Sequence, residues 1–337
     1  MRALAIQSPG NVGLIDVSKP EPRDGELLLL VRYVGMCGTD LNSFRGKNPL
    51  VTFPRIPGHE ISATVVESRS SDQRWQPGLD VTLSPYTSCG LCASCRRGRA
   101  NACLNNQTLG VQRDGAMTEF ITVPAEKVYA AALSLKELCI VEPLTVGFHG
   151  VARGRVEATD TVAVFGCGGV GLGAIAGASF RGARVIAIDV DDSKLAVGKQ
   201  AGAVQTVNSA TMDLHETLQD FTEGRGPDVV IEAIGLPQTF RAAVDEVAFT
   251  GRVVYIGYAK EPVNYETRLF VQKELDIMGA RNAQPADFAD VIRMLEEKRF
   301  PIEAAITVVA PLEEAGNLLR DWSKNPSHYQ KIMVKMD

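Results

Sequence analysis

The sequence predicts a two-domain α/β protein in which a doubly wound parallel sheet is inserted into a mostly β domain. Its 337 residues exceed the size at which a single hydrophobic core usually stops growing, so two domains are expected. Up to Ala132, short apolar runs are separated by turns that contain proline and glycine, which is typical of β structure. From Thr161 the pattern changes to strands that alternate with helices, which is typical of parallel βαβ units.

The apolar runs of the first part are clearest in ELLLLVRYVG and ISATVVE. The later part contains six short apolar strands with helices predicted between them: TVAVFG, RVIAID, VQTVN, DVVIEAIG, GRVVYIG and DIMGA. One amphipathic helix is then predicted over 285–298, followed by short strand-like pieces that end at KIMVKM. Because this tail is too short to fold alone, we expect one domain formed by 1–148 and 284–337, and a second formed by 149–283.

Composition and charge argue against several classes of function. The chain is 45% apolar and 22% charged with a formal net charge of −5, so nothing in it predicts binding to nucleic acid or to an anionic membrane. The uncharged segment 161–180 is rich in glycine and divides into a strand, a turn and a helix, so it is not predicted to span a membrane. The N-terminal sequence lacks the pattern of a signal peptide, and the cytoplasm is the expected location.

Four of the seven cysteines form the strongest chemical signal in the sequence. They lie in CGLCASC and, after seven further residues, at one more position: Cys89, Cys92, Cys95 and Cys103. Disulfides are not expected in a cytoplasmic chain, whereas four thiolates from one short segment can close a tetrahedral shell around zinc. The spacing therefore predicts a structural zinc site, with an iron–sulfur cluster as the main alternative.

A second candidate metal site combines Cys37 in GMCGTD, His59 and Glu60 in PGHE, and Glu142 in VEPL. A thiolate, an imidazole and a carboxylate form an incomplete shell that leaves one position for water or substrate, which is typical of catalytic zinc. Taken singly, each residue has an ordinary alternative role in a core or on a surface. Their combination predicts a catalytic zinc site.

A glycine-rich loop follows the strand TVAVF directly and opens a helix. The residues of this predicted cofactor site are Gly166, Gly168, Gly169, Val170 and Gly171. Glycines permit a tight turn and a close approach to a pyrophosphate, to which a helix N-terminus offers free N–H groups. Asp189 ends the next strand, where a carboxylate can bind ribose hydroxyls and would repel a 2′-phosphate, so NAD is predicted rather than NADP. Lys194 lies close enough in sequence to reach a ribose.

The motifs CGTD, GHE, CxxCxxCx7C, EPL and GxGGxG, in this order, resemble those of medium-chain zinc-dependent dehydrogenases, in particular the branch with sorbitol, threonine and galactitol-phosphate dehydrogenases. The resemblance covers essentially the whole chain. It implies a GroES-like domain that carries both zinc ions, an inserted Rossmann domain, and an active site in the cleft between them. It also implies that Cys37, His59 and either Glu60 or Glu142 hold the catalytic zinc, while Asp40 braces His59 as an acceptor.

The same resemblance implies the reversible oxidation of a secondary hydroxyl of a polyol or sugar acid, with NAD as the acceptor. Zinc would lower the pKa of the bound hydroxyl, and the carbinol hydrogen would leave as hydride. Thr39 would accept the hydroxyl proton. Asn42 stands where this family often has a histidine, and because an amide does not titrate, the outward proton route must differ and could run through Glu60 and water.

Two further positions are assigned by resemblance alone. Arg281 follows the last strand of the inserted domain, where relatives bring a polar residue to the nicotinamide and substrate. Lys331 stands where a basic residue can approach the pyrophosphate. For both, solvated surface charge is the alternative interpretation. The stretch ARNAQPADF is similar to sugar-acid dehydrogenases of the L-galactonate type, which favours a substrate of that kind.

Two alternative functions remain open from the sequence. A threonine-type 3-dehydrogenase would use the same residues. Because the residues do not distinguish the two functions, the rate of turnover of threonine must be compared with that of hexonates. A nucleotide-binding relative without catalysis belongs to a different class, and the complete set of ligand residues argues against it. Besides a small-molecule substrate, the expected partner is a second copy of the chain, in a homodimer or homotetramer formed through the edge strand of the inserted domain.

Overall fold

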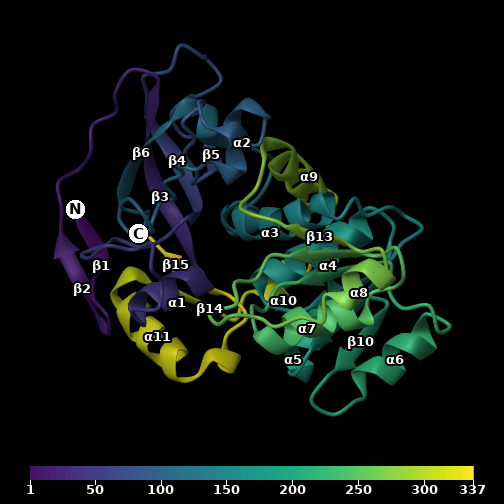
Figure 1. Ribbon diagram of the computed structural model, residues 1–337. Helices are drawn as coiled ribbons and strands as arrows, with labels where there is room; N and C mark the ends of the chain where they lie inside the picture. The colour runs from purple at the N-terminus through teal and green to yellow at the C-terminus, as the bar shows by residue number, and fades with distance from the viewer. Residues whose placement is uncertain (337) are drawn as a thin grey trace. The chain divides into compact units, whose positions relative to one another are not determined.

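A computed structural model describes residues 1–336, and the chain folds into two compact units (Figure 1). The first unit contains Met1–Glu142 together with the C-terminal part from Ala305 onward. The second contains Pro143–Ala304. The second unit is thus inserted in the sequence of the first, as the change of pattern along the chain predicts.

The first unit is a β domain with the GroES-like fold, built on a seven-stranded sheet of order β14-β15-β3-β4-β5-β7, with β6 paired to β3. The strands of this sheet are β3 (Glu26–Met36), β4 (Glu60–Ser68), β5 (Asp80–Leu83), β6 (Phe120–Pro124), β7 (Val128–Ala130), β14 (Val308–Pro311) and β15 (Ile332–Lys335). A separate two-stranded sheet consists of β1 (Arg2–Ser8) and β2 (Asn11–Asp16). The helical elements are α1 (Gly38–Phe44), α2 (Ala93–Arg96), η1 (Ala100–Ala102), η2 (Ala125–Lys127), α11 (Leu312–Lys324) and η3 (Pro326–His328).

Strand β3 organises the first unit because it pairs with β4, β6 and β15. Its run of leucines and valines explains this position, since apolar side chains such as Leu27 and Leu29 are fully buried in the core. In the register of β3 with β4, Val34 lies opposite Ile61, and Gly35 lies opposite Glu60. The end of β3 and the start of β4 are therefore held side by side.

The second unit is the predicted Rossmann domain. Its six-stranded parallel sheet has the order β10-β9-β8-β11-β12-β13. These strands are β8 (Thr161–Phe165), β9 (Arg184–Asp189), β10 (Gln205–Asn208), β11 (Val229–Glu232), β12 (Arg252–Tyr255) and β13 (Asp276–Gly279). The connecting helices are α4 (Gly169–Phe180), α5 (Asp192–Gln200), α6 (Leu214–Phe221), α7 (Pro237–Glu246) and α8 (Arg268–Gln272). Every residue of β8 is buried, as expected for a central parallel strand with helices on both faces.

The borders of the units differ from the predicted domain boundaries of 148/149 and 283/284. Helix α3 (Leu135–Arg153) runs through the first border as one continuous element. Helix α9 (Pro285–Glu296) belongs to the second unit, because Asp287 in its first turn pairs with His149 and Arg293 lies over the ring of Phe180. Residues 284–304, which were predicted to rejoin the β domain, therefore pack with the Rossmann domain, up to α10 (Ile302–Ala305) at the second border.

The C-terminal part also contains one element that the sequence pattern did not predict. In place of short strand-like pieces alone, α11 forms between β14 and β15 and packs against α1 and β2 (Figure 1). The buried residues Leu312, Ala315 and Leu319 of α11 recur at the helical spacing. Polar residues lie between them, so the apolar positions of the helix form no continuous run in the sequence. Within residues 1–336, no helix has the length and apolar character needed to cross a membrane.

Candidate active site

The predicted catalytic metal ligands come together from the adjoining ends of β3 and β4. Cys37 is the N-cap residue of α1, directly after β3, while His59 and Glu60 stand at the start of β4. One ligand atom from each of these three side chains lies within 4.8 Å of the other two. A sulfur, a nitrogen and an oxygen donor in one buried place are a donor set that zinc accepts, with one position left for a further ligand.

Asp40 lies beside this set and organises its backbone. Its carboxylate accepts hydrogen bonds from the backbone N–H of Cys37, at 2.9 Å, and of Gly58, at 3.4 Å. The distance from Asp40 Oδ1 to His59 Nδ1 is 3.8 Å, so the expected brace acts here through charge rather than through a hydrogen bond. Burial raises the pKa of Asp40, an effect that the charge of His59 opposes. Burial alone would lower the pKa of His59, but Asp40 and Cys37 hold it well above its ordinary value.

Glu60 is held by a buried ion pair with Lys331. The Nζ atom of Lys331 lies 2.7 Å and 2.6 Å from the two carboxylate oxygens of Glu60, and it also donates to the carbonyl of Met36 at 3.2 Å. A Cβ at position 35 would lie 2.0 Å from Glu60 Oε2, so a residue larger than glycine there would displace this carboxylate. The predicted contact of Lys331 with a pyrophosphate stays a prediction. In the structure, Lys331 pairs with Glu60, one of the three candidate metal ligands.

Glu142, the alternative carboxylate ligand, has a different partner. The hydroxyl of Tyr86 donates a hydrogen bond to Glu142 Oε1, and both side chains are buried. Burial raises the pKa of Glu142 to about 7. Among the described residues, the compact ligand group contains Glu60 and not Glu142. Sequence reasoning did not single out Tyr86, because nothing in PYTSCG relates its position to that of Glu142.

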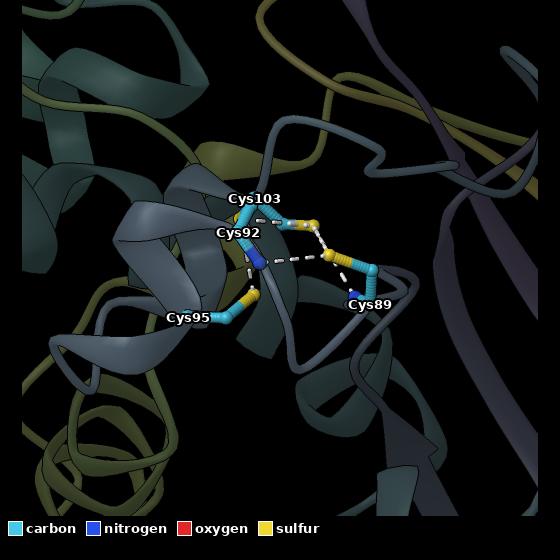
Figure 2. A group of neighbouring side chains, drawn as sticks. All are labelled: Cys89, Cys92, Cys95 and Cys103. Carbon is cyan, nitrogen blue, oxygen red and sulfur yellow. Dashed lines mark hydrogen bonds between the residues drawn. The ribbon is translucent and has the colours of Figure 1, made fainter.

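The four cysteines of the predicted structural site converge in one small lobe, as Figure 2 shows. The distances between Cys89 and Cys103 Sγ and between Cys92 and Cys95 Sγ are both 3.5 Å. A hydrogen bond with Ser94, supported by backbone N–H groups, lowers the pKa of Cys92 to about 5. A cluster of four sulfur atoms within 4.8 Å of one another is the donor set of a closed zinc site.

The predicted cofactor loop has the geometry that its glycines permit. Gly166 adopts a φ of +97°, and a Cβ at Gly171 would lie 1.8 Å from the carbonyl oxygen of Gly166. Gly168 is the N-cap of α4, so Gly169 and Val170 form the first helical turn with free N–H groups. These features fit the close approach of a dinucleotide pyrophosphate to the loop.

Asp189 at the end of β9 connects two parts of this cofactor site. Its Oδ2 accepts from the backbone N–H of Cys167 at 2.7 Å, and its Oδ1 accepts from that of Val190 at 2.8 Å. A carboxylate offers about four lone-pair positions, so hydroxyl donors of a ribose can still be accepted. Asp189 therefore holds the glycine-rich loop in place, and it also lies where a ribose is expected to bind.

The remaining predicted residues are placed as follows. Lys194 lies in the first turn of α5, where its backbone N–H donates to Asp191, and Arg281 lies half-buried between β13 and α9. Thr39 is half-buried in α1, and its carbonyl accepts from the Ser43 hydroxyl at 2.9 Å. Contacts of these three side chains with cofactor or substrate stay predictions.

Comparison with known proteins gives two family matches. The model of the alcohol dehydrogenase GroES-like domain matches residues 23–132, and that of the zinc-binding dehydrogenase matches residues 169–297. The L-galactonate-5-dehydrogenase of Escherichia coli is 30% identical, over 91% of this chain and 91% of the relative. The erythritol/L-threitol dehydrogenase of Mycolicibacterium smegmatis is 32% identical, over 93% of this chain and 92% of the relative. A solved short chain alcohol dehydrogenase from Escherichia coli, complexed with NADH, has a TM-score of 0.92 at 27% identity and covers 99% of both chains.

Loss of one cysteine of the lobe tests the structural site. We expect Cys92→Ser to reduce bound zinc from two ions to one per chain, because three thiolates no longer close the shell. Metal analysis of the purified protein measures this, and limited proteolysis within 89–103 should become faster. Cys167→Ser, which changes a buried cysteine outside both metal sets, is the control and should retain both ions. Full zinc content in Cys92→Ser would contradict the assignment.

Replacement of Lys331 tests the buried ion pair. In the metal-free protein, Lys331→Met leaves the Glu60 carboxylate buried without its cation, which should lower the free energy of unfolding by about 3 kcal/mol. Urea denaturation measures the change. Glu60→Gln in addition should restore part of the loss, because the uncompensated charge is then removed. Lys47→Met, at an exposed lysine, is the control. If Lys331→Met and Lys47→Met lowered the free energy of unfolding equally, the ion pair would not stabilise the fold.

Proposed function

Because the chain belongs to the zinc-binding alcohol dehydrogenases, we propose that it oxidises a secondary hydroxyl of a polyol or sugar acid to the ketone, reversibly and with NAD. The observation that carries the proposal is the group of half-buried Cys37 with buried His59 and Glu60, whose ligand atoms lie within 4.8 Å of one another. The substrate class is supported by two relatives, which are named for a sugar acid and for two short polyols.

The donor sets of the chain fit the two zinc ions that we assign to it. Cys37, His59 and Glu60 would hold the catalytic ion, and Cys89, Cys92, Cys95 and Cys103 the structural one. The buried Nδ1 of His59 has no hydrogen-bond partner among the described residues and faces Asp40 Oδ1 at 3.8 Å, so the charge of Asp40 can support this imidazole as a zinc ligand. Zinc supplies Lewis acidity toward an alcohol oxygen, and nicotinamide supplies the hydride acceptor.

Each of the chain's own residues then has a stated task. Asp40 maintains the backbone of the Cys37 turn and places negative charge beside His59, which favours its basic ring. Thr39 would accept the hydroxyl proton of the substrate. Lys331 orients Glu60 and compensates its charge. A proton that leaves through Glu60 would therefore be carried by a carboxylate that is already paired with Lys331. Proton release through Asn42 is excluded because an amide does not titrate.

The residues of the second unit explain the choice of cofactor. The Gly166–Gly171 loop and the N-terminus of α4 would receive the pyrophosphate, while Asp189 favours ribose hydroxyls over a 2′-phosphate. Lys194 and Arg281 are proposed to contact the ribose and the nicotinamide. The cytoplasm is proposed as the place of the reaction, because four of the seven cysteines are assigned to a zinc site rather than to disulfides.

An edge strand of the parallel sheet supports a proposal of association with a second copy. Strand β13 is the edge of the parallel sheet and pairs only with β12 among the described residues. Its Ile277 is 40% exposed, and Val271 of the neighbouring α8 is 84% exposed. An unpaired edge with apolar side chains is a template for another strand, so we propose a homodimer or homotetramer built on this edge.

The first test is an assay of NADH formation by the zinc-loaded protein. The panel contains polyols, hexonates, sugar phosphates and threonine, each with a chelated control. We expect activity on a polyol or hexonate that is lost with the metal. Strong activity on threonine alone would instead identify a threonine-type 3-dehydrogenase, and silence across the panel despite bound zinc and NADH would favour a non-catalytic relative.

The association through β13 is tested by light scattering. Ile277→Lys combined with Val271→Lys places two charges at the proposed interface and should produce monomers, while bound zinc remains unchanged. Leu50→Lys, at a leucine that is 57% exposed in the first unit, is the control and should leave the assembly intact. A wild-type protein that is already monomeric would contradict the proposal.

A further inference from the structure

Half-buried Arg113 has no acidic partner in the described part of the chain, and it precedes the segment 115–117, which is hydrogen-bonded to the residues before His59. Among the described residues, the guanidinium of Arg113 makes a single hydrogen bond, from Nη2 to the carbonyl of Pro85 at 3.3 Å. Its Nε is buried and has no hydrogen-bond partner. Because a guanidinium has five N–H donors and stays charged, most of its binding capacity is unused.

Within residues 1–336, no carboxylate pairs with the guanidinium of Arg113. The neighbouring Asp114 is engaged elsewhere, since its Oδ1 accepts from Arg55 Nη1 at 2.9 Å and from the backbone N–H of Ile56 at 3.1 Å. The sequence from 81 to 113 contains neither aspartate nor glutamate. Burial lowers the pKa of Arg113, and no charge interaction offsets this cost. A partly desolvated cation without a partner is unfavourable unless an anion binds to it.

Two connections through neighbouring residues link Arg113 to the candidate site. On one side, its partner Pro85 precedes Tyr86, whose hydroxyl donates to Glu142. On the other side, the residues that follow Arg113 are hydrogen-bonded to the segment that leads into His59: Gly115 N–H to Ile56, Ala116 N–H to Gly58 and Met117 N–H to Pro57, at 2.8–3.0 Å. Glycine at 110 and 115 is required for this close packing, since a Cβ would lie 2.6 Å and 2.4 Å from atoms of Gly58.

We propose that Arg113 determines substrate specificity by binding an oxyanion, a carboxylate or a phosphate, at the end of the substrate away from the hydroxyl that is oxidised. This inference rests on the proposed function and narrows its substrate class from polyols in general to anionic ones. The planar guanidinium can bind two oxygens of either group at once. A neutral polyol leaves the arginine without a partner and is bound more weakly.

Calorimetric titration of the zinc-loaded protein with NADH bound tests the inference, because reduced cofactor prevents turnover. The probes share one carbon chain: galactitol, galactonate and galactitol 1-phosphate, together with the corresponding gluco series. We expect at least one anion to bind more tightly than its neutral polyol, and the preferred anion distinguishes a carboxylate site from a phosphate site. Arg113→Met should weaken the binding of that anion about 10- to 100-fold and leave the affinity for the neutral polyol unchanged.

Two further variants make the result specific. Arg113→Lys keeps the charge without the planar fork and should restore only part of the affinity. Arg97→Met removes an exposed arginine from the same acid-free segment and should leave the affinity for all probes unchanged. The inference is overturned if no anion binds, if the neutral polyol binds as tightly as both anions, or if Arg113→Met weakens all probes equally. Since binding is measured without turnover, absence of NAD-dependent oxidation would sink the proposed function independently of this result.

Discussion

The pairing of β3 with β4 is the constraint on which the candidate site depends. The register that sets Gly35 opposite Glu60 brings the turn after β3, with Cys37, against the start of β4, with His59 and Glu60. The glycine leaves the space that the Glu60 carboxylate occupies, and a slip of one residue would turn every side chain of the strand to the other face. The ion pair of Glu60 with Lys331 then connects this corner to β15, which pairs with β3 on its other side. Three strands from distant parts of the sequence thus define one buried site.

Much of this organisation could be predicted because the relevant signals are local. Strong periods of apolar residues identified the six parallel strands, and short spacings identified the cysteine lobe and the glycine loop. Cys37, His59 and Glu60 were grouped, together with Glu142, by the chemistry of their side chains and by resemblance to a family, since nothing in their separation along the chain predicts their distance in space.

The features that escaped prediction depend on contacts between distant residues. Glu60 pairs with Lys331, and Glu142 accepts a hydrogen bond from Tyr86. Both partners are far in sequence from the carboxylate that they contact, and no sequence pattern indicates these contacts. The packing of α9 with the second unit depends on the buried pair of Asp287 with His149, which no local period shows. The sequence does not single out Arg113, because its distinctive property is the absence of a carboxylate near it in the described structure. Such properties emerge only when the neighbours of a side chain are known.

The discontinuity of the first unit affects how the protein is made. A chain that emerges from the ribosome folds from its N-terminus, domain by domain. Strand β3 can pair with β15, and Glu60 with Lys331, only after residues 331–335 have been synthesised. The second unit, complete at Ala304, can fold earlier. The order of folding therefore differs from the order of the sequence, because the metal-binding unit contains residues from both sides of the second unit and completes its structure after it.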